Sequence, residues 1–385
     1  MLRSQLRRML PHLGAGLCIS YGAATYCHGD HGSSRLAALE QRLLRLEARH
    51  GIQRYSGQGD GVFSWDEALT AAMPVDARAY EKDMHGGCNE DRRTGIVYTG
   101  IPGAGLYQIS SDLTIWTKLG SDPRLKSNIH GLVVFAHNGV TQLALAQNED
   151  ERVLIVDLDG VVKQELRRPN GGEFSCGEAN AYYSARRTQP LSGAKVFACT
   201  DVTYLNGKIY VVTGYCDGDF VLTAEQKAGG DEWVWAPVAW GGKGERAGQF
   251  RTAHGILAHQ GHIYVANREA FEVLKFTPDG VLVESMPDIP DGSRICNISY
   301  AEQQGWFVMN ALAPLPHTAP KTAPIYCHTG NVLISTVDAG SLGIPVLKHL
   351  HHVHPHYIDG HLYLLVHGWR DGKFAVLKHE PDHTL

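Results

Sequence analysis

Three histidines occupy similar places in a repeating pattern. They lie in Asn128-Ile-His130-Gly, in Thr252-Ala-His254-Gly and in His354-Pro-His356, each shortly before a turn sequence. Three imidazoles that converge and leave a fourth position open are a common catalytic metal site. Nitrogen ligands favour Zn²⁺, although Cu, Fe, Mn or Ni also fit. The sequence therefore predicts a metal site of three histidines.

The third ligand has two candidates on one strand. The distance to the following turn favours His354, whereas the preceding proline favours His356, which we adopt as the ligand. Their spacing of two residues places both on one strand face, so the other would line a substrate pocket. His85, before Gly86, has a similar place in the first repeat and is a reserve ligand or substrate contact. The other histidines near the end of the chain are expected at the surface or rim: His351, His352, His361, His367 and His379.

The elements that would position these side chains are short strands. From about residue 75, runs of Val, Ile, Tyr and Phe are separated by Asn-Gly, Asp-Gly and Gln-Gly turns, which are typical of hairpins. Six turn glycines recur, at 95, 139, 207, 261, 305 and 360. A repeat of about 40–50 residues made of antiparallel strands indicates a β-propeller. The sequence predicts an all-β fold, a six-bladed β-propeller with a short N-terminal helix.

The sixth repeat is one strand short before the sequence ends. In propellers such a gap is closed by a strand from the N-terminal side, for which 52–55 or Gly61-Val-Phe-Ser-Trp65 are the candidates. Two long insertions, 168–198 and 313–324, interrupt the repeats. Long loops of this kind often carry function.

Three segments are predicted along the chain. Residues 1–30 resemble a weak secretory leader, with Arg3, Arg7 and Arg8 before a mildly apolar stretch. Residues 31–51 have leucines at helical spacing and predict an amphipathic helix, and residues 52–385 form the propeller. If residues 1–30 act as a leader, we expect a periplasmic or secreted protein. If they do not, we expect a cytoplasmic protein. Export would make Cys176, Cys199 and Cys216 candidates for a disulfide.

Composition excludes several classes of protein. The 385 residues include 35 Lys and Arg against 40 Asp and Glu, a net charge of −5, so no nucleic-acid surface is expected. The sequence contains no apolar run long enough for an integral membrane span. The 21 histidines are far more than a core needs.

The motifs together resemble a known enzyme family. The stretch from His254 to Val265-Ala-Asn-Arg268-Glu269 resembles peptidyl-α-hydroxyglycine α-amidating lyase, a six-bladed propeller of the NHL-repeat kind. The segment Gly214-Tyr215-Cys216-Asp is similar to that family's catalytic tyrosine segment. The His130-Gly-Leu and Pro-His356 segments are similar to its first and third metal-ligand motifs.

The resemblance implies a site and a reaction. Zinc would be bound by His130, His254 and His356, and a lyase of this kind breaks the C–N bond of a carbinolamide. Tyr215 would be the base, with its pKa lowered by a nearby cation, and Arg268 would stabilise charge. The substrate pocket would use His354, His85, Tyr182 and Arg186.

Three departures separate this sequence from the family pattern. The strand after Gly95 lacks the family's substrate-binding arginine, Tyr357 replaces an acidic calcium ligand, and His354 replaces a methionine. These differences leave the substrate open among small molecules, peptides and glycans.

Two other functions fit the same repeats. One is a propeller that binds a protein or glycan partner without catalysis, its histidines being structural. The other is a metal-dependent polysaccharide lyase acting beside a uronate, with a cationic cleft built from Arg168, Arg186, Arg187 and Arg251.

Overall fold

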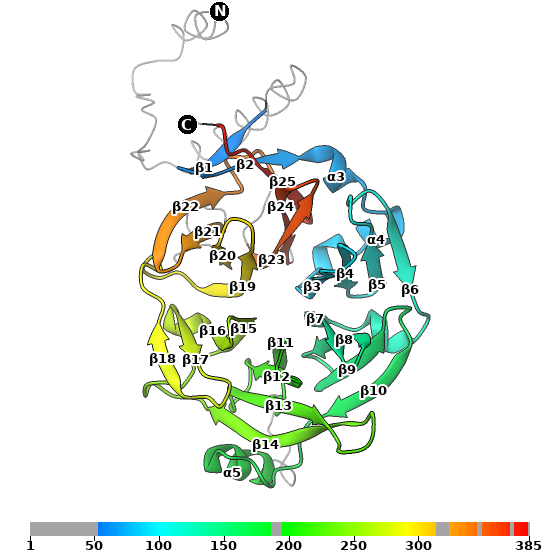
Figure 1. The fold of residues 1–385 in the computed structure, drawn as a ribbon, viewed down its shortest axis with the longest axis vertical. Coiled ribbons are helices and arrows are strands. Elements are labelled where there is room, and N and C mark those ends of the chain that lie inside the picture. Colours follow the sequence, from blue (N-terminus) through cyan, green and yellow to red (C-terminus); the bar gives the residue numbers. More distant parts are fainter. Residues whose placement is uncertain (1–52, 186–194, 313–322, 345–348, 370–372, 384–385) are drawn as a thin grey trace, which may run out of the picture. The chain divides into compact units, whose positions relative to one another are not determined.

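A computed structural model describes residues 53–185, 195–312, 323–344, 349–369 and 373–383. In these ranges six antiparallel sheets follow one another around an axis, as Figure 1 shows, and the predicted six-bladed propeller is confirmed. The innermost strands contact their neighbours on both sides and so close the ring. The predicted leader and N-terminal helix lie outside the described residues.

The blades follow the chain in order. Blade 1 comprises β3 (Cys88–Asp91), β4 (Ile96–Ile101), β5 (Gly105–Ile109) and β6 (Trp116–Leu119), and blade 2 comprises β7 (Ile129–His137), β8 (Val140–Gln147), β9 (Arg152–Asp157) and β10 (Val162–Arg167). Blade 3 comprises β11 (Cys199–Leu205), β12 (Lys208–Thr213), β13 (Phe220–Gln226) and β14 (Trp233–Gly241), and blade 4 comprises β15 (Ala253–His259), β16 (His262–Asn267), β17 (Glu272–Phe276) and β18 (Leu282–Ser285). Blade 5 comprises β19 (Ile295–Ala301), β20 (Trp306–Ala311), β21 (Pro324–Thr329) and β22 (Val332–Asp338), and blade 6 begins with β23 (Leu350–Ile358), β24 (His361–Gly368) and β25 (Ala375–His379).

Short helices connect the sheets. Before blade 1 the chain forms α3 (Glu67–Ala71), α4 (Val75–Arg78) and η1 (Glu81–Asp83), and η2 (Pro123–Lys126) leads into blade 2. Asp66 caps α3 by accepting a hydrogen bond from the Leu69 amide. In the first insertion, α5 (Gly177–Ala185) lies outside β14 (Figure 1), and its Tyr183 packs into the core between blades 2 and 3.

The hairpin from each innermost strand turns on one of the six predicted glycines. Their φ angles lie between 70° and 82°. In four of these turns the residue before the glycine also has positive φ: Asn138, Asn206, Gln260 and Asp359. Two successive positive φ angles match the type I′ geometry that favours Asn-Gly and Asp-Gly, which is why these pairs mark the blades in the sequence.

An N-terminal strand completes blade 6. Strand β2 (Gly61–Asp66) pairs antiparallel with β25, with Phe63 opposite His379 and Trp65 opposite Leu377. Strand β1 (Tyr55–Gln58) adds to the outside of β2. The predicted closing strand at 61–65 is therefore confirmed.

The hydrophobic core lies between neighbouring sheets. Between blades 3 and 4, for example, Trp240 packs on Phe276 with ring centroids 4.4 Å apart, and Phe250 joins them. Each sheet thereby buries the face that it would expose alone, and this packing holds the innermost strands at fixed distances around the axis.

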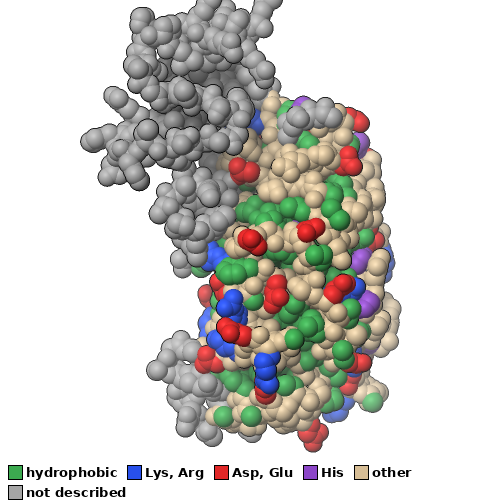
Figure 2. Space-filling view, turned by 90° about the vertical axis from the view of Figure 1, so that its left-hand side faces the viewer, with side chains coloured by type: hydrophobic (Ala, Val, Ile, Leu, Met, Phe, Trp, Pro, Cys, Tyr) green, Lys and Arg blue, Asp and Glu red, His purple; other side chains and the backbone are tan. Residues whose placement is uncertain are grey.

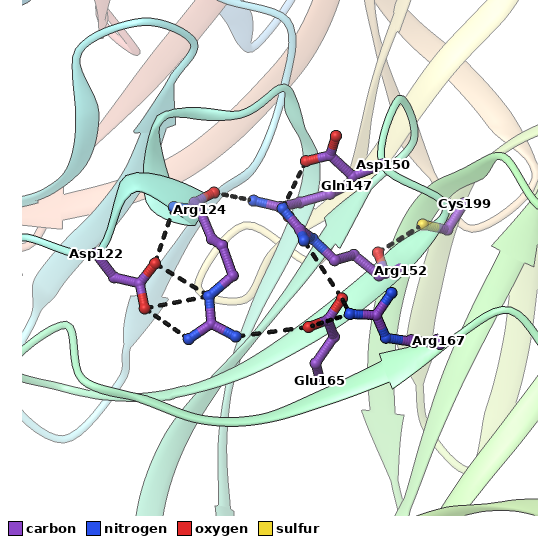
Figure 3. A network of polar contacts seen from close by, with 8 residues as sticks. All are labelled: Asp122, Arg124, Gln147, Asp150, Arg152, Glu165, Arg167 and Cys199. Carbon is purple, nitrogen blue, oxygen red and sulfur yellow. Dashed lines mark hydrogen bonds and ion pairs between the residues drawn. The ribbon is translucent and has the colours of Figure 1, made fainter.

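A polar network fixes the outer part of blade 2 (Figure 3). The Glu165 carboxylate forms ion pairs with the guanidinium groups of Arg124, Arg152 and Arg167. The Cys199 thiol donates to the Arg152 carbonyl over 3.1 Å. Because the six cysteines in the described part of the chain are free, the predicted disulfide among Cys176, Cys199 and Cys216 is wrong for this structure.

Surface charge agrees with the composition. On the face in Figure 2, basic and acidic side chains are interspersed. Of the helices that the structure describes, none has the length and apolar character needed to cross a bilayer.

Candidate functional site

The candidate site is built at β-bulges in the innermost strands. In β7, β11, β15, β19 and β23 the pairing register shifts near the start of the strand. The residues within these irregular steps are His130, Thr200, His254 with Gly255, Cys296 and His351. A bulge leaves one residue out of the ladder and re-aims its side chain. Five blades thus supply one side chain each at a similar level of the channel.

Four histidines come together at this level. The ring centroids of His130 and His254 are 4.9 Å apart, and His351 lies 5.2 Å from His130 and 4.8 Å from His254. His85, which precedes blade 1, lies 4.2 Å from both His130 and His351 and stacks on Trp369. All four are buried. We call these residues the histidine cluster.

Glycine follows two of these histidines for a steric reason. A Cβ on Gly131 would lie 2.3 Å from Asp201 Oδ1, and a Cβ on Gly255 would lie 2.7 Å from the Cys296 carbonyl oxygen. Such contacts are closer than real Cβ atoms allow. The His-Gly pairs of the sequence therefore let the next blade approach while the histidine faces the channel.

Backbone carbonyls of the next blade orient two of the rings. His130 Nδ1 donates to the Thr200 carbonyl over 2.5 Å, and His254 Nδ1 donates to the Cys296 carbonyl over 2.7 Å. Each donation fixes the proton on Nδ1 and places a lone pair on Nε2, as in metal-bound histidines.

Two buried ring nitrogens in the cluster have no hydrogen-bond partner. These are His130 Nε2 and His351 Nδ1. Buried polar atoms are almost always paired, and an unpaired one points to a bound ion or water. Two groups have ligand atoms within 4.8 Å of one another: His85 with His130 and His351, and His254 with Cys296 and His351. The donor atoms therefore fit a transition metal.

Burial keeps the cluster uncharged. It lowers the pKa of His130 to about 3, and it lowers the pKa values of His85, His254 and His351 well below the ordinary range, with the neighbouring imidazoles adding to the effect. Neutral imidazole is the form that binds metal.

Tyr215 and Arg268 lie beside the cluster. The Tyr215 hydroxyl is 2.7 Å from His254 Nε2 and accepts a hydrogen bond from Arg268 Nη1 over 2.5 Å. Arg268 begins η3 (Arg268–Ala270) and is buried, and Tyr215 is held at φ 57°. Burial raises the pKa of Tyr215 above its ordinary value although Arg268 opposes the shift. The lowered pKa expected from sequence is thus absent without a further cation.

His356 does not reach the cluster. Its Nδ1 lies 2.7 Å from Glu90 Oε2 and its Nε2 lies 2.8 Å from the Ser111 carbonyl oxygen, so both ring nitrogens are occupied. His354 Nε2 lies 3.7 Å from the same Glu90 oxygen. The blade 6 histidine that lies in the cluster is His351, because the bulge lies five residues before His356, near the start of β23.

Several other predicted positions differ from the structure. His351, His352, His367 and His379 are buried rather than at the surface, whereas His361 is exposed as expected. The predicted substrate contact Tyr182 lies on α5 outside β14, where its hydroxyl donates to the Val196 carbonyl. Arg186 lies outside the described residues.

The cationic cleft of a polysaccharide lyase is not formed by the described arginines. Arg168 pairs with Glu151, and Arg251 pairs with Glu245. Arg187, like Arg186, is outside the described residues.

Away from the cluster, a cavity of about 580 Å³ opens at the hairpin end of the inner strands. Its lining includes Glu90, Tyr204, Tyr300 and His354. The charges there are paired within the protein: Arg92 with Glu302, and Arg93 with Asp91.

Comparison with known proteins gives the fold alone. No family model matches the chain, and no curated protein matches its sequence. Among solved structures, a luciferin-regenerating enzyme is similar, with a TM-score of 0.50, 11% identity, and coverage of 83% of this chain and 94% of that chain. The chain is a six-bladed β-propeller that places a buried cluster of four histidines and a cysteine at one end of its central channel.

Proposed function

We propose that the protein is a metal-dependent lyase whose metal ion is held by His85, His130 and His351. The observation that carries the proposal is that buried imidazoles converge and that one of their nitrogens, His130 Nε2, has no hydrogen-bond partner. Zn²⁺ is the ion we favour for an all-nitrogen set, with other divalent transition metals as substitutes. When bound, the ion would polarise a substrate oxygen and add positive charge beside Tyr215.

Tyr215 and Arg268 are the proposed catalytic residues. Tyr215 is the general base, and it is 40% exposed, so that it is accessible to a substrate while its hydroxyl stays against the cluster. Burial alone favours the neutral phenol. The base therefore depends on nearby positive charge, which Arg268 supplies in part and the metal centre completes.

The proposed reaction is cleavage of the C–N bond in a carbinolamide. Tyr215 takes the proton of the substrate hydroxyl, and the C–O bond becomes a carbonyl as the C–N bond breaks. The departing amide nitrogen takes a proton, which Tyr215 returns, so the products are an amide and a carbonyl compound. Arg268 stabilises the negative charge that passes between the phenolate and the substrate oxygen.

A purely structural role for the histidines explains the site less well. His356 has both nitrogens paired, with Glu90 and the Ser111 carbonyl. Unpaired nitrogens also occur at His328, His354 and His367, but among the described residues the three-membered groups whose ligand atoms lie within 4.8 Å of one another all belong to the cluster or to Cys296 beside it. A binding platform without metal gives no reason for unpaired, neutral imidazoles facing one another in a buried channel.

The first test measures metal content by mass spectrometry on protein purified without added metal. We expect at least one equivalent of a transition metal in the wild type and its loss in a His130→Ala/His351→Ala variant. His262→Ala is the control, because His262 bonds only to the nearby Gln260 carbonyl. Absence of metal in the wild type, even after reconstitution, would contradict the proposal.

The second test compares two substrate classes. One assay measures the cleavage of α-hydroxyglycine amides, and the other measures the formation of unsaturated products from uronides. We expect carbinolamide cleavage, and a Tyr215→Phe variant that retains metal but loses activity by about 100-fold or more, in the range of a lost general base. If the protein cleaved uronides and no carbinolamide, the proposed substrate would be wrong and the substrate would be a sugar.

A further inference from the structure

We infer that the cluster contains a second metal position, in which Cys296 supplies a thiolate together with His254 and His351. This inference rests on the proposed function, because the first position is the one held by His85, His130 and His351. The occupant would be a borderline or soft divalent ion, Zn²⁺ above all, since imidazole and thiolate ligands select such ions.

The placement of Cys296 argues against an ordinary core thiol. It is the bulge residue of β19, in the same structural position as His130 in β7 and His351 in β23. Its ligand atom lies within 4.8 Å of ligand atoms of His254 and His351, and all three residues are buried. The hydrogen bond that its Sγ donates to the Arg294 carbonyl oxygen is long, at 3.8 Å.

Two further contacts prepare this position for a cation. The Cys296 carbonyl accepts the Nδ1 proton of His254, so the same residue that offers the thiolate also keeps a lone pair on His254 Nε2. That lone pair now accepts the Tyr215 hydroxyl proton over 2.7 Å, and a metal ion in this position would replace that hydrogen bond. Burial raises the pKa of the Cys296 thiol to about 11, and the Arg268 guanidinium beside it opposes that shift.

His351 is common to both ligand sets, and its two nitrogens differ. Nε2 lies 3.2 Å from Nε2 of His85, whereas Nδ1 is buried and has no hydrogen-bond partner. We assign Nε2 to the first position and Nδ1 to the second. Filling both positions releases two protons to solvent, one from the Cys296 thiol and one from the His351 ring.

Cobalt(II) titration of the metal-free full chain tests the inference. We expect two equivalents to bind in the wild type and a near-ultraviolet charge-transfer band from thiolate to cobalt to appear. Cys296→Ser should bind one equivalent without that band. Cys327→Ser, a buried cysteine in β21 of the same blade, should behave as the wild type does.

The outcomes separate the two proposals. One equivalent in the wild type, or two equivalents without a thiolate band, overturns the second position but leaves the first intact. No binding in any variant means that the proposed function itself fails. X-ray absorption of the zinc-loaded wild type checks the result without a variant, because a sulfur neighbour at about 2.3 Å is expected and its absence contradicts the inference.

Discussion

The two ends of the central channel contain the same residue types but use them differently. At the hairpin end, Glu90 and the Ser111 carbonyl occupy both nitrogens of His356. At the other end, His130 Nε2 and His351 Nδ1 face the cluster with no partner. The number of histidines is therefore a poor guide to a metal site. A single unpaired nitrogen is not enough either, since His354 at the hairpin end also has one. The useful indicator is a group of at least three buried donor residues whose ligand atoms lie within 4.8 Å of one another, some of them unpaired.

The two ends of the channel also differ in the charge of their side chains. At the hairpin end, Glu90 would have a raised pKa from burial alone, but the nearby His354 and the hydrogen-bonded His356 hold its pKa well below the ordinary value. That end balances an ionised carboxylate internally. The histidine cluster contains no carboxylate and stays neutral, which leaves it able to accept a cation from outside.

The largest expected difference between the two ends is in metal binding. His351→Ala should weaken metal affinity by more than about 100-fold, since loss of a ligand exceeds the effect of losing an outer partner. His356→Ala should leave affinity unchanged within experimental error. Competition with a fluorescent zinc chelator measures both. Equal losses in the two variants would remove the distinction between the ends.

A backbone change close to the cluster should have an intermediate effect. Gly131→Ala places a methyl group against Asp201, so we expect a loss of about 1–3 kcal/mol in the free energy of unfolding and weaker metal binding. Gly230→Ala is the control, because nothing lies within 4 Å of its Cβ. Urea unfolding with and without zinc measures both effects, and wild-type behaviour of Gly131→Ala would refute the close packing.

Glu90→Gln should affect stability but not metal binding. Because the folded protein lowers the pKa of Glu90, its contribution is present above the ordinary value of 4.5 and is lost as the pH falls below it. The variant should lose about 1–3 kcal/mol at pH 7 and show a shallower decline on acidification. Unfolding curves from pH 3 to pH 7 give the comparison; a variant with the wild-type profile would show that Glu90 does not stabilise this end.

The fold and three of the four cluster histidines, with His85 as a reserve ligand, could be predicted from sequence because local chemistry specifies them. Turn glycines marked the blades, and the apolar run at 61–65 indicated the closing strand. His130 and His254 were recognisable because glycine follows each. His351 lacks that mark, since at its junction the glycines, Gly86 and Gly87, belong to the neighbouring blade.

A simple count could have located His351. It lies nine residues before Gly360 (360 − 351), as His130 lies nine before Gly139 (139 − 130). The proline beside His356 was the more visible feature, and it misled the prediction. The bulges themselves, and the pairing of each histidine nitrogen, depend on the neighbouring blade and have no local pattern in the sequence.

The closure of blade 6 by β2 has a consequence for biosynthesis. On the ribosome, His85 and His130 emerge early, whereas His351 emerges more than two hundred residues after His130. It can join them only after β25 has been translated and has paired with β2. The histidine cluster therefore cannot assemble on a nascent chain, and uptake of the proposed metal would report that the ring has been completed.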